Sequence, residues 1–251
     1  NATLIIIKSI MRYAKKSKYV QDISDFIDIK LRKRTATKKE VQRLQNKFLN
    51  ADELKSCLQQ LKEINPRIGL AMEFIALTGL RCGELLALRV QDYYKDKSII
   101  NVNGTIIKSA RNGEDTQRGT PKNSYSYRDV IINDRAKYIL DSIILENKKL
   151  ASWNSKKYKD KGYIFTTSTG NPFNIQYINT KLRKIKLADK KISTHIFRHT
   201  HISILSELGL PLKSIMQRVG HNDPKTTLSI YTHVTNNMNN EMKNKLKALS
   251  F

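Results

Sequence analysis

All five histidines of this 251-residue chain lie between His195 and His233, close to Arg198 and Tyr231. Histidine titrates nearest to neutral pH and can accept, donate or hold a proton, whereas arginine stays charged and binds phosphate oxygens. Five histidines scattered by chance would spread over the whole chain. Their clustering beside arginine and tyrosine in a basic protein indicates chemistry on a phosphodiester.

The chain is strongly basic. It has 46 Lys and Arg residues against 22 Asp and Glu residues, a net charge of +24 at pH 7. Such a charge favours a polyanionic partner, because neutralised phosphates release counterions and bind the protein strongly at low salt. Ribosomal proteins and disordered basic tails share this signature. A hydrophobic fraction of 39%, with 10 Gly and 5 Pro, is instead typical of a folded protein.

Other features exclude whole classes of protein. Cys57 and Cys82 are too few for a disulfide scaffold. The longest aliphatic run, residues 4–7, is too short for a membrane span or a signal peptide, so we expect no membrane partner. The sequence begins at Asn1, without methionine and inside a helical pattern. We interpret it as a piece of a longer protein.

The first 44 residues are predicted to be separate from a compact body over residues 45–251. Apolar residues recur on one face of a helix predicted over residues 1–19. A polar and basic strip follows, which is typical of a solvated linker. Between two DNA-binding parts, the same strip would follow the DNA backbone.

The body is predicted to be mainly α with a small antiparallel β-sheet, an α+β fold. Asn50 and Glu53 resemble a capping box that begins a helix ending near Ile64. Ile, Val and Tyr residues alternate over residues 98–108 and 125–132, which predicts the sheet with a long turn between its strands. Helical patterns cover residues 67–77, 80–88, 134–149, 174–187, 194–208, 211–218, 224–232 and 236–249, and residues 163–165 suit a short strand.

Each candidate site residue also has a plain structural explanation. His195 and Arg198 share one helix face and would converge on a phosphate, although such a pair is common on basic helices. Gly220 is expected to end a helix so that His221 projects from the turn. Tyr231 suits either a nucleophile or half-buried packing with its hydroxyl satisfied.

Three further candidate residues precede this cluster in the sequence. Arg81 lies in an apolar segment, where its charge requires a partner. Glu84 is three residues on and would form a salt bridge with it, either as a structural pair or to orient the guanidinium toward a phosphate. Lys122 lies in a turn before the second strand, where a lysine is ordinarily solvated.

Taken together and in order, these residues resemble the tyrosine recombinase (phage integrase) family. The matching strings are "TGLRCGELLAL", "TPKNSYSYRDVII", "THIFRHTHIS" and "VGHNDPKTTLSIYTHV", from about residue 48 to residue 240. Within the family, the chain is most similar to integrases of bacteriophages or integrative elements of Gram-positive bacteria. The resemblance identifies Arg81, Lys122, His195, Arg198, His221 and Tyr231 as catalytic, with Glu84 in support.

The resemblance implies a site-specific DNA recombinase or integrase. Tyr231 would attack the scissile phosphate, forming a 3′-phosphotyrosine and releasing a 5′-hydroxyl, without metal, cofactor or ATP. A tyrosine needs help to lose its proton at neutral pH, and His195 would accept it. Arg81 and Arg198 would hold the non-bridging oxygens as charge develops on phosphorus.

The remaining roles also follow from the resemblance. His221 would donate a hydrogen bond to the same phosphate, and Lys122 would protonate the departing 5′ oxygen. The region around Lys122 aligns poorly in this family, so Lys108 remains a second candidate. The other three histidines are expected to be supporting or structural: His199, His201 and His233.

The family also implies an assembly. A homo-tetramer would bind double-stranded DNA at attachment sites in the bacterial cytoplasm, associated with the nucleoid. In the absence of DNA, the isolated protein is expected to be a monomer. Residues 1–44 would be the C-terminal helix of a truncated core-binding domain plus its linker, and residues 45–251 the catalytic domain. Residues 236–251 would either be exchanged between protomers or pack on their own domain.

Three other functions compete with this interpretation. A metal-dependent nuclease needs carboxylates near the histidines, but only Glu207 and Asp223 lie between His195 and His233. A type IB topoisomerase-like enzyme uses related chemistry, but such enzymes typically have lysine in place of the first histidine. A non-catalytic DNA-binding module would bind DNA without forming a covalent adduct.

Overall fold

The computed structural model describes residues 2–29, 46–108, 116–120, 126–187, 190–221 and 224–247. The chain divides into two compact units, residues 1–41 and residues 42–251. The first unit contains α1 (Ala2–Lys16) and α2 (Ser24–Ile27), so the predicted N-terminal helix is confirmed. None of the helices in the described part of the chain is long and apolar enough to cross a membrane.

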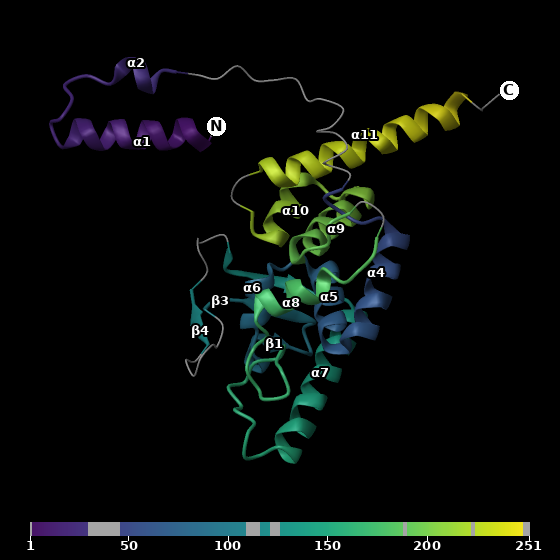
Figure 1. The fold of residues 1–251 in the computed structure, drawn as a ribbon. Helices are drawn as coiled ribbons and strands as arrows, with labels where there is room; N and C mark the ends of the chain where they lie inside the picture. The colour runs from purple at the N-terminus through teal and green to yellow at the C-terminus, as the bar shows by residue number, and fades with distance from the viewer. Residues whose placement is uncertain are drawn as a thin grey trace. The chain divides into compact units, whose positions relative to one another are not determined.

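The second unit is mainly helical, with short strands between its helices (Figure 1). Its helices are α4 (Ala51–Ile64), α5 (Pro66–Thr78), α6 (Cys82–Ala87), the 3-10 helix η1 (Val90–Asp92), α7 (Asp134–Trp153), α8 (Ile175–Leu182), α9 (Thr194–Glu207), α10 (Leu212–Val219) and α11 (Lys225–Lys247). Its strands are β1 (Tyr93–Tyr94), β2 (Ile99–Val102), β3 (Thr105–Lys108), β4 (Gln117–Gly119) and β5 (Arg128–Ile131). The predicted fold class is therefore confirmed.

Local sequence signals fix the ends of the first two helices of this unit. The Asn50 side chain accepts the Glu53 backbone N–H at 2.8 Å and Glu53 accepts the Asn50 N–H at 2.8 Å, which confirms the capping box. Gly79 ends α5 with a φ of 72°, a left-handed conformation that favours glycine. A side chain at Gly79 would also overlap the His201 ring.

Within the described residues, β2 and β5 confirm the predicted antiparallel pairing, but the strands form two small sheets rather than one. One sheet has the order β1-β2-β5 and the other pairs β3 with β4, all antiparallel. The predicted strand over residues 98–108 is divided at Asn103 and Gly104. Gly104 leaves room for the Arg118 guanidinium, which binds Asn103 and Ala87 O across the break.

Two other predicted elements differ from the structure. Residues 163–165 form no strand, and Tyr163 makes only an isolated bridge to Arg89. The two helices predicted over residues 224–232 and 236–249 form one helix in the described residues, α11, because neither Gly nor Pro lies between them.

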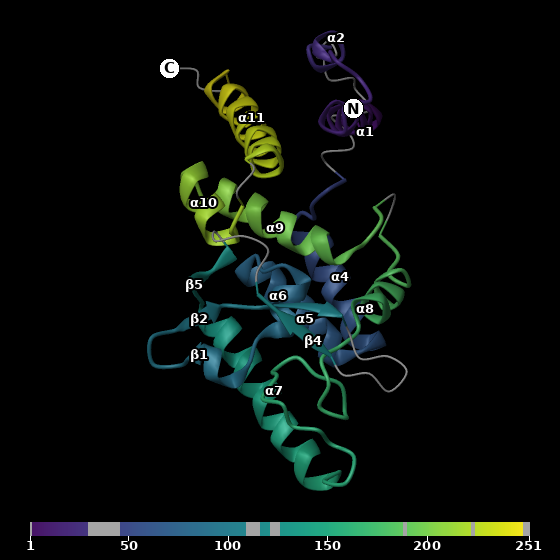
Figure 2. The ribbon, with the colours of Figure 1, turned by 90° about the vertical axis from the view of Figure 1, so that its left-hand side faces the viewer.

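Two apolar clusters hold this unit together. The larger one is formed by the helices α4, α5, α6, α7 and α8, the β1-β2-β5 sheet and the first turn of α9. The smaller one consists of Ile202, Ile215, Val219, Ile230 and Val234, from α9, α10 and α11. Figures 1 and 2 show these three helices gathered at the end of the unit opposite the tip of α7. Helix α9 belongs to both clusters and thereby connects them.

We predict that Phe74→Ala lowers the free energy of unfolding by about 3–5 kcal/mol. Phe74 is fully buried and its ring lies 5.3 Å from that of Phe165, so truncation leaves a cavity in the larger cluster. Urea unfolding measures the change. Trp153→Ala is the control, because this side chain is 82% exposed and its loss should change the value by less than about 0.5 kcal/mol.

Candidate active site

Arg198 is buried in the second turn of α9, with 2% of its surface exposed. Its guanidinium donates to Gly79 O and to Val219 O, both at 2.6 Å. These carbonyls lie where α5 and α10 end, and such carbonyls lack a helical partner and carry partial negative charge. Burial, with Arg81 nearby, lowers the pKa of Arg198 to about 9, so it stays charged at neutral pH.

Arg81 precedes α6 and is held from two sides. Its Nη1 binds Glu84 Oε1 at 2.6 Å, and its Nη2 donates to Gly220 O at 2.7 Å. The predicted pairing with Glu84 is therefore confirmed. The Arg81 side chain remains 34% exposed, whereas that of Glu84 is 3% exposed. Arg81 thus presents a fixed guanidinium to solvent.

Arg128, which the sequence analysis did not single out, completes this group. Its Nη2 binds Glu84 Oε2 at 2.9 Å, its Nε donates to Arg218 O at 2.7 Å, and its side chain is 8% exposed. A signal was present in the sequence, because alternation in a strand puts Arg128 on the same face as the buried Val130. An arginine on a buried strand face requires partners.

Glu84 is the carboxylate that these arginines share. Burial raises its pKa, but Arg128 foremost, followed by Arg81 and Arg198, outweighs burial and keeps the pKa below the ordinary value. Glu84 is therefore ionised at neutral pH. Its Oε2 also accepts the backbone N–H of Arg81 at 3.0 Å, which fixes the start of α6.

His195 lies near the start of α9, three residues before Arg198, and its side chain is exposed. Partial burial, together with the charges of Arg198 and Arg81, lowers the pKa of His195. The imidazole is therefore neutral at pH 7. A neutral, accessible imidazole beside two guanidiniums is able to accept a proton.

His221 follows Gly220, which ends α10 with a φ of 69°, as the sequence predicted. Its Nδ1 lies 2.5 Å from Thr227 Oγ1. Burial foremost, then the charges of Arg198 and Arg81, lower the pKa of His221 to about 3, so the ring is neutral. When Nδ1 accepts the Thr227 hydroxyl, Nε2 carries the hydrogen and is a donor.

Tyr231 lies on α11, which packs against α9 and α10, the helices that carry Arg198 and precede His221. Its ring is half-buried and packs against the smaller apolar cluster. The structure thus places Tyr231 on a helix adjacent to the arginines. Half-buried packing, the alternative to a nucleophilic role that the sequence offered for Tyr231, is therefore also observed.

The two lysine candidates are placed differently. Lys122 lies outside the described residues. Lys108 is the last residue of β3, a strand that packs against α6, and its side chain is exposed.

The remaining histidines contribute to packing or to the local electrostatics. His201 is 3% exposed, with Nδ1 2.8 Å from Ala76 O and Nε2 accepting from Arg218 Nε at 3.0 Å. The His199 ring lies 6.4 Å from that of His195, and the His233 ring lies 6.0 Å from that of Phe48. Among the described residues, no three His, Cys, Asp or Glu side chains form a group that could hold a metal ion.

The sequence of this chain is similar to those of known integrases over most of its length. The model of the Phage integrase family matches residues 47–238. The integrase of Staphylococcus phage L54a is 45% identical over 184 residues, which cover 72% of this chain and 52% of that protein. The probable integrase of prophage ps2 in Lactococcus lactis subsp. lactis is 40% identical over 217 residues, covering 83% and 56%. This chain spans about half the length of these relatives.

Solved structures share the fold. A Tn1549 transposon integrase in complex with a circular intermediate DNA has a TM-score of 0.65 at 18% identity, covering 92% of this chain and 73% of that chain. XerA recombinase has a TM-score of 0.56 at 23% identity, covering 81% and 64%. At these identities the likeness concerns the fold, in which helices surround small antiparallel sheets.

We predict that the free energy of unfolding decreases as the pH falls below about 6.5, and that His201 contributes to this decrease. Burial foremost, with Arg218, lowers the pKa of His201 to about 3 in the folded protein. The unfolded chain therefore binds a proton that the folded protein excludes. Stability from the neutral ring is present above pH 6.5 and is lost toward pH 3, by up to about 1.4 kcal/mol per pH unit.

Urea unfolding at pH 7 and pH 5 tests this prediction. The difference between the two free energies should be smaller for His201→Gln than for the wild-type protein, because glutamine does not titrate. An equal difference in both proteins would contradict the prediction.

Proposed function

Because the chain belongs to the phage integrase family, we propose that it is the catalytic part of a site-specific DNA recombinase. Its relatives include the integrase of Staphylococcus phage L54a, the probable integrase of prophage ps2 of Lactococcus lactis and the ICEBs1 integrase of Bacillus subtilis. The observation that carries the proposal is the Arg81 guanidinium, fixed by Glu84 and Gly220 O yet partly exposed beside Arg198 and His221.

The arginines would hold the scissile phosphate. Each Nη of Arg81 carries a second hydrogen that neither Glu84 nor Gly220 O uses, and these hydrogens suit two phosphate oxygens. Arg198 adds a second positive charge that backbone carbonyls hold in place. Donors fixed before the substrate binds need no reorganisation as negative charge develops on the phosphate.

The histidines would handle the proton and complete the phosphate contacts. Tyr231 Oη attacks phosphorus while His195 accepts its proton, so the P–O bond to the 5′ oxygen breaks as the 3′-phosphotyrosine forms. His221 Nε2 donates to a non-bridging oxygen, and Lys122 returns a proton to the departing 5′ oxygen. Attack by a second 5′-hydroxyl reverses these steps, and one ester replaces another without ATP.

The partner is double-stranded DNA at attachment sites, bound by a tetramer of this protein. Acting on bacterial DNA places the protein in the bacterial cytoplasm. We propose residues 1–44 as the end of a core-binding domain plus its linker. Ile5, Ile6 and Ile10 of α1 are 58–66% exposed, as expected of a helix whose apolar face packs within such a domain.

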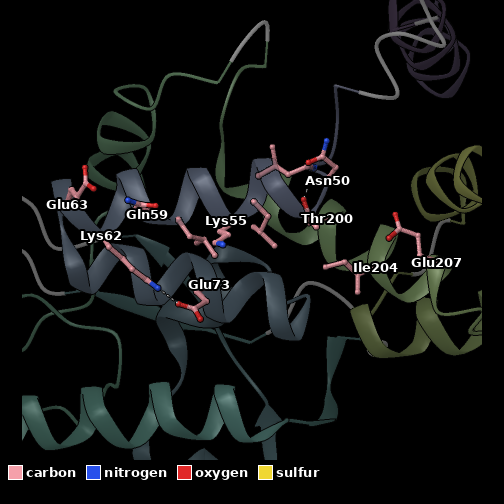
Figure 3. Close-up of a pocket in the computed structure, with 13 residues that line it drawn as sticks. Asn50, Lys55, Gln59, Lys62, Glu63, Glu73, Thr200, Ile204 and Glu207 are labelled. Atoms are coloured by element: carbon pink, nitrogen blue, oxygen red, sulfur yellow. Dashed lines mark hydrogen bonds and ion pairs between the residues drawn. The ribbon is translucent and has the colours of Figure 1, made fainter.

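We propose that a groove between α4 and α9 receives the C-terminal segment of a neighbouring copy of the chain. Its volume is about 820 Å³, and its lining includes the apolar residues Leu54, Leu58 and Ile204. Figure 3 shows Ile204 of α9 on one side of the groove and Lys55 and Gln59 of α4 on the other. The C-terminal segment carries Met238 and Met242, which are 40% and 54% exposed, and suits such an apolar groove on a neighbouring copy. Contact there would reach α9, the helix that carries His195 and Arg198.

We predict that the wild-type protein forms a covalent adduct with nicked duplexes taken from the ends of its source element, and that Tyr231→Phe forms none. Phenylalanine keeps the ring packed against the smaller cluster but lacks the nucleophilic oxygen. Denaturing gels detect the adduct. Tyr177→Phe, a change at a 43% exposed tyrosine on α8, is the matched control and should leave adduct formation intact. An adduct with Tyr231→Phe would mean that another residue is the nucleophile.

We also predict that DNA affinity falls by about 100-fold or more between 50 and 200 mM salt, as expected when about four phosphates are neutralised. The net charge of +24 provides the physical reason. Fluorescence anisotropy with a labelled duplex measures the affinity. A nearly flat plot of log affinity against log salt would contradict the prediction.

A further inference from the structure

The C-terminal carbonyls of α10 accept hydrogen bonds from three arginines that belong to three different elements. The pairs are Arg128 with Arg218 O at 2.7 Å, Arg198 with Val219 O at 2.6 Å, and Arg81 with Gly220 O at 2.7 Å. Two of these arginines belong to the proposed phosphate site. The third, Arg128, has no role in the mechanism described above.

Arg128 is committed to contacts within the protein. Besides Arg218 O, it binds Glu84 Oε2 at 2.9 Å and Ser126 O at 3.0 Å, so all three of its nitrogens have acceptors. Its side chain is 8% exposed, too little to contact DNA directly. Any effect of Arg128 on the reaction must therefore act through the groups that it holds.

We propose that Arg128 is a positioning residue that fixes Glu84, and through Glu84 the guanidinium of Arg81, for the reaction assigned under the proposed function. Glu84 binds the Arg81 guanidinium through Oε1, and its Oε2 accepts from both Arg128 and the backbone N–H of Arg81, so Arg128 helps to fix the rotation of the carboxylate from a different element. The Arg128 bond to Arg218 O also ties β5 to the end of α10, which leads directly to His221. Arg128 thus connects the supports of two phosphate-binding groups.

Electrostatics supports the same assignment. The charged groups facing Glu84 are Arg81 at the start of α6, Arg128 on β5 and Arg198 on α9. Removing Arg128 leaves the buried carboxylate with less compensation, so its pKa rises. Glu84 would then be protonated at a higher pH, and Arg81 would lose its ionic partner as the pH falls.

The experiment compares Arg128→Met and Arg128→Lys with the wild-type protein and with Arg67→Met. Arg67 is the matched control, because it also binds a carboxylate (Glu146), an amide (Asn147) and a backbone carbonyl, and its side chain is 15% exposed. Arg67 lies at the start of α5, at the opposite end of that helix from Gly79, and Gly79 is the residue that adjoins the site. Single-turnover cleavage of nicked duplexes, the DNA dissociation constant and the pH dependence of both cleavage and urea unfolding are measured.

We expect Arg128→Met to lower the cleavage rate by about 100-fold at saturating DNA, with the dissociation constant changed less than about twofold. The acid limb of its pH–rate profile should move up by about one pH unit. Arg128→Lys keeps the charge beside Glu84 but not all three contacts, so its loss should be about 10-fold. Arg67→Met should reduce stability but leave the rate and the pH profile unchanged.

A rate within twofold of wild type, or a rate loss in Arg128→Met no greater than in Arg67→Met, would overturn the proposal. If the wild-type protein forms no adduct, the proposed function fails, and the link between Arg128 and Glu84 is judged by unfolding alone. In that case the acid-induced loss of stability must begin at a higher pH in Arg128→Met than in the wild-type and Arg67→Met proteins. The same onset in all three would refute the link.

Discussion

The site depends on holding several guanidiniums close together before any phosphate is present. Arg81, Arg128 and Arg198 repel one another, and the chain already carries a net charge of +24. Buried Glu84 provides one full negative charge between them, and the C-terminal carbonyls of α5 and α10 provide partial ones. Removing the partner of a buried charge costs several kcal/mol, so these contacts stabilise the fold as well as the site.

Burial, together with the same positive field, determines the state of the histidines. Burial and nearby arginines lower the pKa values of His195, His199 and His221, so all three rings are neutral at pH 7. A neutral imidazole accepts a proton at one nitrogen and donates a hydrogen bond from the other. A phosphate bound to Arg81 and Arg198 would offset part of this field and make His195 a stronger base when the substrate is in place.

The sequence predicted what depends on neighbours along the chain. Three such relations join residues that are at most three positions apart. They are the pairing of Arg81 with Glu84, the common helix face of His195 and Arg198, and the position of Gly220 directly before His221. Long-range contacts were not predictable in this way. Arg128 meets Glu84 across 44 positions and Arg218 across 90, and the carbonyls that hold the arginines have no sequence signature. The contact between Arg118 and Asn103, at the break between β2 and β3, likewise joins residues that are 15 positions apart.

The two apolar clusters meet at the candidate site. Arg198 lies on α9, which belongs to both clusters, and its guanidinium binds carbonyls at the end of α5 in the larger cluster and at the end of α10 in the smaller one. Helix α11 packs against α9 and contributes Ile230 and Val234 to the smaller cluster. Under the proposed mechanism, this shared packing would hold Tyr231 on α11 beside the helix that carries Arg198.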